Sequence, residues 1–440
     1  MKTFIYNSLR MRKVGVLALL ALCVNLLTPQ VAQALPAFAR QTGQNCVACH
    51  AGGQFPELTP YGRLIKLTGY TIGSRDIPVS VMALASAAKT KTPTPDDTKD
   101  GNLIFQTGSV FLAGKITDNI GLFSQFTYNN YSGDSGIQGT WGSDNFDMRF
   151  ADRFISPTSD LIVGVALNNN PTVSDVWNSA PAWIIYAPTQ FGVTGPDTGP
   201  TALGGLGGQV AGLNAYLLWN NLVYAEVGAY KTANGVFSFL SQGTPDSGQT
   251  KLSGAAPYVR LALTHEWGAH NLMVGVMGMN ANLFPDPTLQ SGPTTQFRDR
   301  GIDAQYQYLL DPQTISAQFS YVRETINNGV ASLGAVNDSN TLNSLRLKGT
   351  YIYQAKYGAS LSYFHNTGTA DANLYGGSAN FTPNTVGVTP ELFWTPVQNI
   401  RVGLQYYAYS KFDGASTNYD GAGRNAKDNN TAFLYVWGAY

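Results

Sequence analysis

Apolar and polar residues alternate along most of the chain, in segments of about ten residues that begin after residue 78. In one such segment, residues 400–410, Val402 and Leu404 fall on one face while Arg401 and Gln405 fall on the other. The same two-residue period recurs over residues 316–321 and 344–352. This period is that of a β-strand, and strands with one apolar and one polar face are typical of a barrel wall between lipid and a polar lumen.

Short and long connections alternate between these segments. Seven short turns fall at residues 117–119, 156–160, 220–221, 268–269, 311–313, 355–356 and 396–398. Eight long loops rich in Gly, Asn and Pro fall near residues 90–101, 130–144, 169–208, 232–255, 281–295, 325–341, 366–383 and 411–429. The connections separate sixteen predicted strands, and an even number suits a closed antiparallel barrel. A soluble β-sandwich is the alternative, but sandwiches rarely have this many strands and do not sort their loops by length.

The barrel pattern also predicts an orientation and a location. In outer-membrane barrels the short turns face the periplasm and the long loops face the outside. We therefore expect residues 76–440 to form an outer-membrane β-barrel in contact with membrane lipid, with both chain termini in the periplasm. The last segment is amphipathic and ends on the aromatic Tyr440, which suits membrane insertion.

The composition agrees with this class and excludes others. Only 12% of residues are charged, about half the share in an average globular protein. The 27 basic and 27 acidic residues balance, so we expect no nucleic-acid partner, which would require a basic face. A mean hydropathy of -0.10 is too low for a helical membrane protein.

Residues 1–34 have the three parts of a cleavable signal peptide. A basic start precedes the apolar stretch Val14–Leu27, and the Ala-Gln-Ala sequence at residues 32–34 forms a small-residue cleavage site. A transmembrane anchor is the alternative, but the apolar stretch is shorter than the roughly 20 residues that span a bilayer. Cys23 follows the bulky Leu22 rather than a small residue, so we do not expect it to be lipidated.

The sequence Cys46-Val-Ala-Cys49-His50 is the attachment motif of a c-type haem. The two thiols lie about one helical turn apart and bond the two vinyl groups of the porphyrin, while the imidazole of His50 binds the iron as the proximal ligand. A zinc site would require further ligands, and the exported chain has no third cysteine. A thioredoxin-like dithiol would require a βαβ context, which the strand pattern lacks. We therefore predict one c-type haem, attached through Cys46 and Cys49.

The haem motif lies in a segment of about forty residues, 35–75, which we call the N-terminal segment. This segment is too short to enclose a haem with a core of its own. We therefore expect it to be helical or irregular and to plug or cap the barrel lumen from the periplasmic side.

The sixth ligand of the haem iron is not evident from the sequence. The candidates are Met273, Met277, Met279 and His270. The three methionines share the lumen-facing side of one predicted strand, and a thioether is a known haem ligand. Packing against the plug is the alternative role for each methionine. Strand parity directs His265 toward lipid or places it at the turn, and His365 lies near the far end of its strand.

Several predicted inward-facing cations are candidates to pair with haem propionates, or alternatively to line a pore. They are Arg149, Arg153, Arg260, Arg346, Lys348 and Arg401.

A longer pattern surrounds the haem motif. It reads Ala34-x-Pro36-x-Phe38-Ala39-Arg40-Gln41-Thr42-Gly43, then Cys46-x-x-Cys49-His50, then Pro56-x-Leu58-Thr59-Pro60-Tyr61-Gly62-Arg63, then Lys66-Leu67-x-Gly69-Tyr70. This pattern of about thirty-seven residues closely resembles the fused monohaem cytochrome–porins, with Tyr61 and Ile65 where that family usually has Phe. Members of the family act as outer-membrane iron oxidases in bacteria that live on Fe(II).

The resemblance implies that Cys46 and Cys49 carry the haem, that His50 is its axial ligand, and that nearby residues form its packing and polar shell. Those shell residues are Phe38, Arg40, Gln41, Pro60, Arg63 and Tyr70. We therefore expect extracellular Fe(II) to be the electron donor and a periplasmic cytochrome or copper protein to be the acceptor. The alternatives are a solute porin with a haem-bearing plug, and an outer-membrane cytochrome with a different electron donor.

Overall fold

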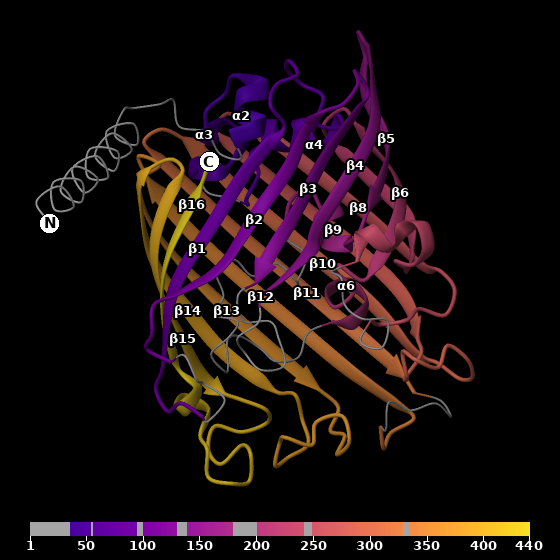
Figure 1. Ribbon diagram of the computed structural model, residues 1–440, viewed down its shortest axis with the longest axis vertical. Coiled ribbons are helices and arrows are strands. Elements are labelled where there is room, and N and C mark those ends of the chain that lie inside the picture. Colours follow the sequence, from indigo (N-terminus) through magenta and orange to yellow (C-terminus); the bar gives the residue numbers. More distant parts are fainter. Residues whose placement is uncertain are drawn as a thin grey trace, which may run out of the picture. The chain divides into compact units, whose positions relative to one another are not determined.

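The computed structural model describes residues 36–53, 56–94, 100–129, 139–178, 200–241, 249–328 and 335–440. The predicted signal peptide lies outside these residues. Sixteen strands pair antiparallel in chain order, and β1 pairs with β16 to close the barrel (Figure 1). The predicted barrel and its strand number are therefore confirmed.

The strands follow the alternating segments of the sequence closely. They are β1 (Val79–Thr90), β2 (Ile104–Lys115), β3 (Ile120–Asn129), β4 (Thr140–Ser156), β5 (Ser159–Asn168), β6 (Val210–Trp219), β7 (Val223–Thr232), β8 (Ala256–Trp267), β9 (His270–Leu283), β10 (Thr295–Leu310), β11 (Gln313–Asn327), β12 (Ser339–Tyr353), β13 (Tyr357–Gly368), β14 (Thr385–Val397), β15 (Ile400–Lys411) and β16 (Thr431–Ala439). Residues 140–144 were expected in a loop but extend β4, where Tyr128 and Trp141 pair across the ladder with ring centroids 5.5 Å apart.

The connections divide between the two ends of the barrel as predicted. Each of the seven short turns lies at one end, which also holds the start of β1 and the end of β16. We call this end the short-turn end, and the opposite end the long-loop end. Helices η2 (Gly235–Leu240) and η3 (Ala426–Asn429) belong to connections at the long-loop end.

The two faces of the wall differ in chemistry. Along β6, for example, Leu213 is 61% exposed on the outside whereas Asn214 is fully buried on the inside. Large apolar side chains such as Val274 and Leu404 are likewise exposed on the outside. Such an apolar outer band is what a membrane-spanning barrel presents to lipid. Among the described residues, no helix is long and apolar enough to cross a bilayer.

The N-terminal segment lies in the lumen at the short-turn end, as predicted (Figure 1). It contains α2 (Pro36–Thr42), α3 (Cys46–Cys49), η1 (Ala51–Gly53) and α4 (Pro60–Leu67). Pro60 occupies the first turn of α4, and the side chain of Thr59 caps it by accepting a hydrogen bond from Gly62 N at 3.1 Å. The side chains of Arg40 and Gln41 then fasten α2 to the ends of β1 and β2.

The connection between β5 and β6 corrects one prediction. Residues 169–208 were expected to form an external loop, but their described parts fold into the lumen. Helix α5 (Pro171–Ser174) and the residues that follow it, including Trp177, are buried between the N-terminal segment and the wall. Helix α6 (Thr201–Gly204) also packs inside, where the backbone N–H of Leu203 donates to Asp299 at 2.7 Å.

Candidate cofactor site

The Cys-x-x-Cys-His motif forms one helical turn. Helix α3 begins at Cys46 and ends at Cys49, both of which line one pocket, and the His50 N–H donates to the Cys46 carbonyl at 2.8 Å. His50 then leaves the helix in an extended conformation and pairs with Leu58 in an isolated bridge. Between them Gly52 adopts φ +59°, a left-handed conformation that favours glycine and reverses the chain.

The imidazole of His50 is buried against the returning chain. Burial lowers the pKa of His50 to about 4, although backbone hydrogen bonds with Pro56 and Glu57 act in the opposite direction. The ring is therefore neutral at physiological pH, as a metal ligand must be. Contact with a backbone carbonyl is also the usual way in which a ligating histidine is oriented.

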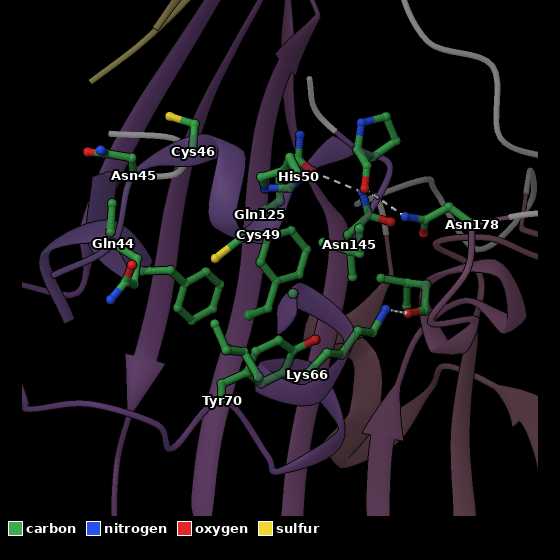
Figure 2. A pocket seen from close by; sticks show the side chains of 18 residues that line it. Gln44, Asn45, Cys46, Cys49, His50, Lys66, Tyr70, Gln125, Asn145 and Asn178 are labelled. Carbon is green, nitrogen blue, oxygen red and sulfur yellow. Dashed lines mark hydrogen bonds between the residues drawn. The ribbon is translucent and has the colours of Figure 1, made fainter. Parts of the chain in front are cut away.

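A pocket opens directly beside the motif (Figure 2). In this view Cys46, Cys49 and His50 lie on one side of the pocket, and Lys66 and Tyr70 lie on the opposite side. The empty space between the lining atoms is about 850 Å³, part of it open to solvent.

The chemistry of the pocket wall fits a haem. The described residues of the β5–β6 connection, 169–178 and 200–209, are called the lumen loop below. Apolar side chains contributed by the N-terminal segment, β3 and the lumen loop would cover the porphyrin faces: Phe38, Leu58, Ile65, Phe123 and Val173. Amide side chains available for the propionates are Gln44, Asn45, Gln125, Asn145 and Asn178. Both thiols and the imidazole line the same space, so the residues required for covalent attachment and axial ligation are together.

The structure does not bring the four candidate sixth ligands to this pocket. Met273, Met277 and Met279 face the lumen as predicted but pack in buried clusters, Met273 against Trp177 and the other two farther along β9. The ring Nδ1 of His270 lies 2.7 Å from the Tyr306 hydroxyl at the short-turn end. None of the four lines the pocket, because strand parity fixes the face of a residue but not its height or its position around the barrel.

Most of the candidate propionate partners are already paired with carboxylates. The ion pairs are Arg149–Asp147, Arg153–Asp160, Arg260–Asp303, Lys348–Glu57 and Arg401–Glu391. The prediction for Arg153 also misjudged its position, since it lies on the exposed extension of β4 rather than in the lumen. None of the six cations lines the pocket.

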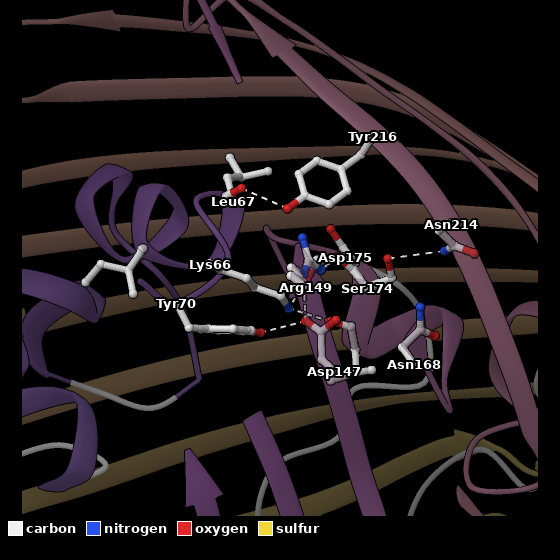
Figure 3. Close-up of polar contacts among 12 residues, drawn as sticks. Lys66, Leu67, Tyr70, Asp147, Arg149, Asn168, Ser174, Asp175, Asn214 and Tyr216 are labelled. Atoms are coloured by element: carbon white, nitrogen blue, oxygen red, sulfur yellow. Dashed lines mark hydrogen bonds and ion pairs between the residues drawn. The ribbon is translucent and has the colours of Figure 1, made fainter. Parts of the chain in front are cut away.

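A buried polar network fastens the N-terminal segment to the wall and to the lumen loop (Figure 3). The Tyr70 hydroxyl donates to Asp147 on β4 at 2.6 Å, and the Arg149 guanidinium donates to the same carboxylate oxygen at 2.8 Å. From β6, Tyr216 donates to the Leu67 carbonyl at 2.8 Å. Lys66 donates to backbone carbonyls of the lumen loop. The segment is thereby held by two strands and a loop that are far away in sequence.

Arg63 forms a second anchor, on the side of β9 and β10. Its guanidinium donates to the Leu58 carbonyl at 2.7 Å and to Asn271 at 2.5 Å. Two glutamine side chains on β10, Gln305 and Gln307, accept further hydrogen bonds from it. Because Leu58 pairs with His50, Arg63 connects the position of the imidazole to the barrel wall.

Sequence reasoning missed the far side of the pocket. Gln125 and Asn145 come from β3 and β4, and Asn178 comes from the lumen loop, where it donates to the Pro56 carbonyl at 2.8 Å. The alternation along β3 predicts that Gln125 faces the lumen, but no pattern in the sequence predicts that it lines the same pocket as Cys49. Apolar residues within this loop, Val176 and Trp177 among them, were a hint that part of it is buried.

We expect the pH dependence of stability to report the burial of Lys66. Burial lowers its pKa from 10.5 to about 8, so protonated Lys66 costs the folded state about 3 kcal/mol below pH 8. As the pH rises from about 8 to 10.5, the folded state loses its proton first and this cost disappears. The free energy of unfolding, measured by urea titration, should therefore increase across that window in the wild type. The increase should be absent in Lys66→Met, and an unchanged increase in that variant would contradict the assignment.

The strand pairing defines this protein as a closed sixteen-stranded antiparallel barrel with an N-terminal segment inside its lumen. No protein-family model matches the chain, and no curated protein matches it. Among solved structures it is similar to OprB of Pseudomonas putida, with 11% identity and a TM-score of 0.49 over 82% of this chain and 94% of that chain. It is also similar to the outer-membrane channel DcaP of Acinetobacter baumannii, with 14% identity and a TM-score of 0.47 over 82% and 96% of the two chains. It is similar as well to OmpF of Salmonella typhi, with 13% identity and a TM-score of 0.47 over 82% of this chain and 97% of that chain.

Proposed function

We propose that the protein is an outer-membrane monohaem c-type cytochrome built into a barrel, and that it transfers electrons. The pocket beside Cys46, Cys49 and His50 carries this proposal, because it joins an attachment motif to a space lined by apolar and amide side chains. A c-type haem supplies a one-electron centre when it is bound. The apolar outer band of the wall supports a membrane location, and export is required because c-type haem is attached outside the cytoplasm.

The residues of this chain have separate tasks in that function. Cys46 and Cys49 would hold the haem covalently, and His50 would ligate its iron. The Pro56 and Glu57 backbone orients the imidazole. Phe38 and its apolar neighbours limit the access of water, which influences the reduction potential of a buried centre.

We further propose Fe(II) as the electron donor and a periplasmic cytochrome or copper protein as the acceptor. This finer assignment rests on the resemblance of residues 34–70 to the cytochrome–porins. Each Fe(II) would become Fe(III) by losing one electron, which the acceptor takes up. The site lies at the short-turn end, which we propose faces the periplasm, and this suits delivery to a periplasmic carrier.

An anaerobic absorption spectrum of the purified, oxidised protein tests the donor. Addition of Fe(II) should produce the bands of the reduced haem, with one Fe(II) consumed for each haem reduced. Dithionite serves as the control for full reduction. A haem that dithionite reduces but Fe(II) does not would overturn the iron assignment while leaving the cytochrome assignment in place.

The second candidate is a porin-type solute channel with a haem-bearing plug. The closed sixteen-stranded wall with its polar inner face favours it. Liposome swelling with small sugars separates the two functions. An electron conduit whose short-turn end is filled by the N-terminal segment should give little swelling. Rapid swelling by the intact, haem-loaded protein would instead support the channel.

A further inference from the structure

Three arginines are exposed together on the outer face of the wall, on two adjacent strands. Arg298 and Arg300 lie on β10, and Arg323 lies on β11. Arg300 and Arg323 are direct partners in the antiparallel register, so their side chains leave the sheet side by side. We call these three residues the arginine patch.

The arginine patch lies at one edge of the apolar outer band. On β10 the outward side chains run from Leu310 at the short-turn end to Ile302, and Arg300 follows as the first charged one. Ten residues along a tilted strand rise about 25 Å, which is the height of the apolar band of a membrane barrel. Asn280 on β9 pairs with Arg298, and Asn343 on β12 pairs with Arg323. On these two strands as well, the outward side chains change from apolar to polar at the height of the arginine patch.

In the part of the chain that the structure describes, no carboxylate forms an ion pair with the arginine patch. The acidic residues of the same two strands, Asp299, Asp303 and Glu324, face the lumen and are buried. Arg300 donates instead to the Asn280 side chain at 3.0 Å and to backbone carbonyls. Within the described residues, none of the three arginines forms an ion pair with a carboxylate.

Like charges directly opposite each other destabilise a sheet, and the effect is greater beside lipid, where the dielectric constant is low. A phosphate group satisfies several guanidinium donors at once and removes the repulsion. At the edge of an apolar band, the phosphates that are always present belong to lipid headgroups. We propose that the arginine patch is a binding site for the phosphorylated headgroup of a lipid in the leaflet at the long-loop end. The proposal requires that the barrel spans a membrane, but it does not depend on the haem.

Lipid binding to the purified, haem-loaded protein in detergent tests this site. The probes are lipopolysaccharide with a phosphorylated diglucosamine, the same lipid after dephosphorylation, and inorganic phosphate. Loss of two arginine contacts should weaken binding of the phosphorylated lipid by about thirtyfold in the double variant Arg300→Gln/Arg323→Gln. Arg298→Gln should weaken it by a smaller factor, and the double lysine variant should retain part of the affinity.

Lys231→Gln is the matched control, because it removes an exposed cation near the same end of β7, away from the patch. Its affinity should equal that of the wild type. An unchanged haem spectrum and unchanged gel migration of the unheated barrel would show that each variant is folded. Equal binding of the dephosphorylated lipid, or efficient displacement by inorganic phosphate, would overturn the lipid assignment. If the double variant instead changed only the oligomeric state, the arginine patch would be an interface between copies of this chain and the proposal would fail.

Discussion

The double variant Cys46→Ser/Cys49→Ser is expected to carry no covalently bound haem while its barrel still folds. Both thioether bonds are lost, and a serine hydroxyl does not replace a thiol in that chemistry. The barrel should survive because each of its sixteen strands is paired on both sides by backbone hydrogen bonds that the motif does not supply. The measurements are haem staining after denaturing electrophoresis, the absorption spectrum, and the mobility shift between unheated and heated barrel.

Val47→Ala is the matched control for that variant. Val47 lies on the same turn of α3, but it is 41% exposed and does not line the pocket. Its haem content should equal that of the wild type. Covalent haem in the cysteine double variant would exclude Cys46 and Cys49 as attachment points. Conversely, Fe(II) oxidation by the haem-free protein at the wild-type rate would overturn the assignment of iron oxidation to the haem.

The barrel was predictable because the sequence patterns that indicate it each extend over only a few neighbouring residues. A two-residue period and the parity of loop lengths are visible within ten or twenty residues, and the register of each hairpin follows from its short turn. The haem motif was equally local, since one turn of α3 contains all its parts. The plug was predictable for a different reason: the segment is too short to bury a large cofactor alone.

The rest of the site was not predictable because it depends on contacts distant in sequence. Lys66 meets the lumen loop more than a hundred residues later, and Arg63 meets Asn271 more than two hundred residues later. Strand parity correctly directed Met273 and its neighbours into the lumen, but the lumen is wide and their place around its wall is set by closure of the whole barrel. The same uncertainty of height misplaced Arg153, which proved to lie on an exposed strand extension.

The crossing of α3 and α4 determines the shape of the pocket, and Gly62 makes this crossing possible. A Cβ added at Gly62 would overlap the Cys49 carbonyl oxygen and would lie 2.9 Å from its carbon and 3.1 Å from the Cys49 Cα. These are backbone atoms of the haem-binding turn, so no side-chain rotation relieves the conflict. Cys49 O also accepts the Thr59 N–H at 2.9 Å, which further fixes its position.

Gly62→Ala is therefore expected to separate α4 from α3 and to loosen the N-terminal segment without opening the barrel. Overpacking typically costs about 1–3 kcal/mol, and we expect the upper end here because only backbone can move. About 3 kcal/mol raises the population of the open segment roughly a hundredfold. Proteolysis of the segment should accelerate accordingly, and the fraction of chains with attached haem should fall. Gly349→Ala is the control, since a Cβ there meets no atom within 4 Å. Equal protease resistance and haem content in both variants would contradict the close crossing, because only a crossing with spare room could accept the added methyl group at residue 62 without moving Cys49.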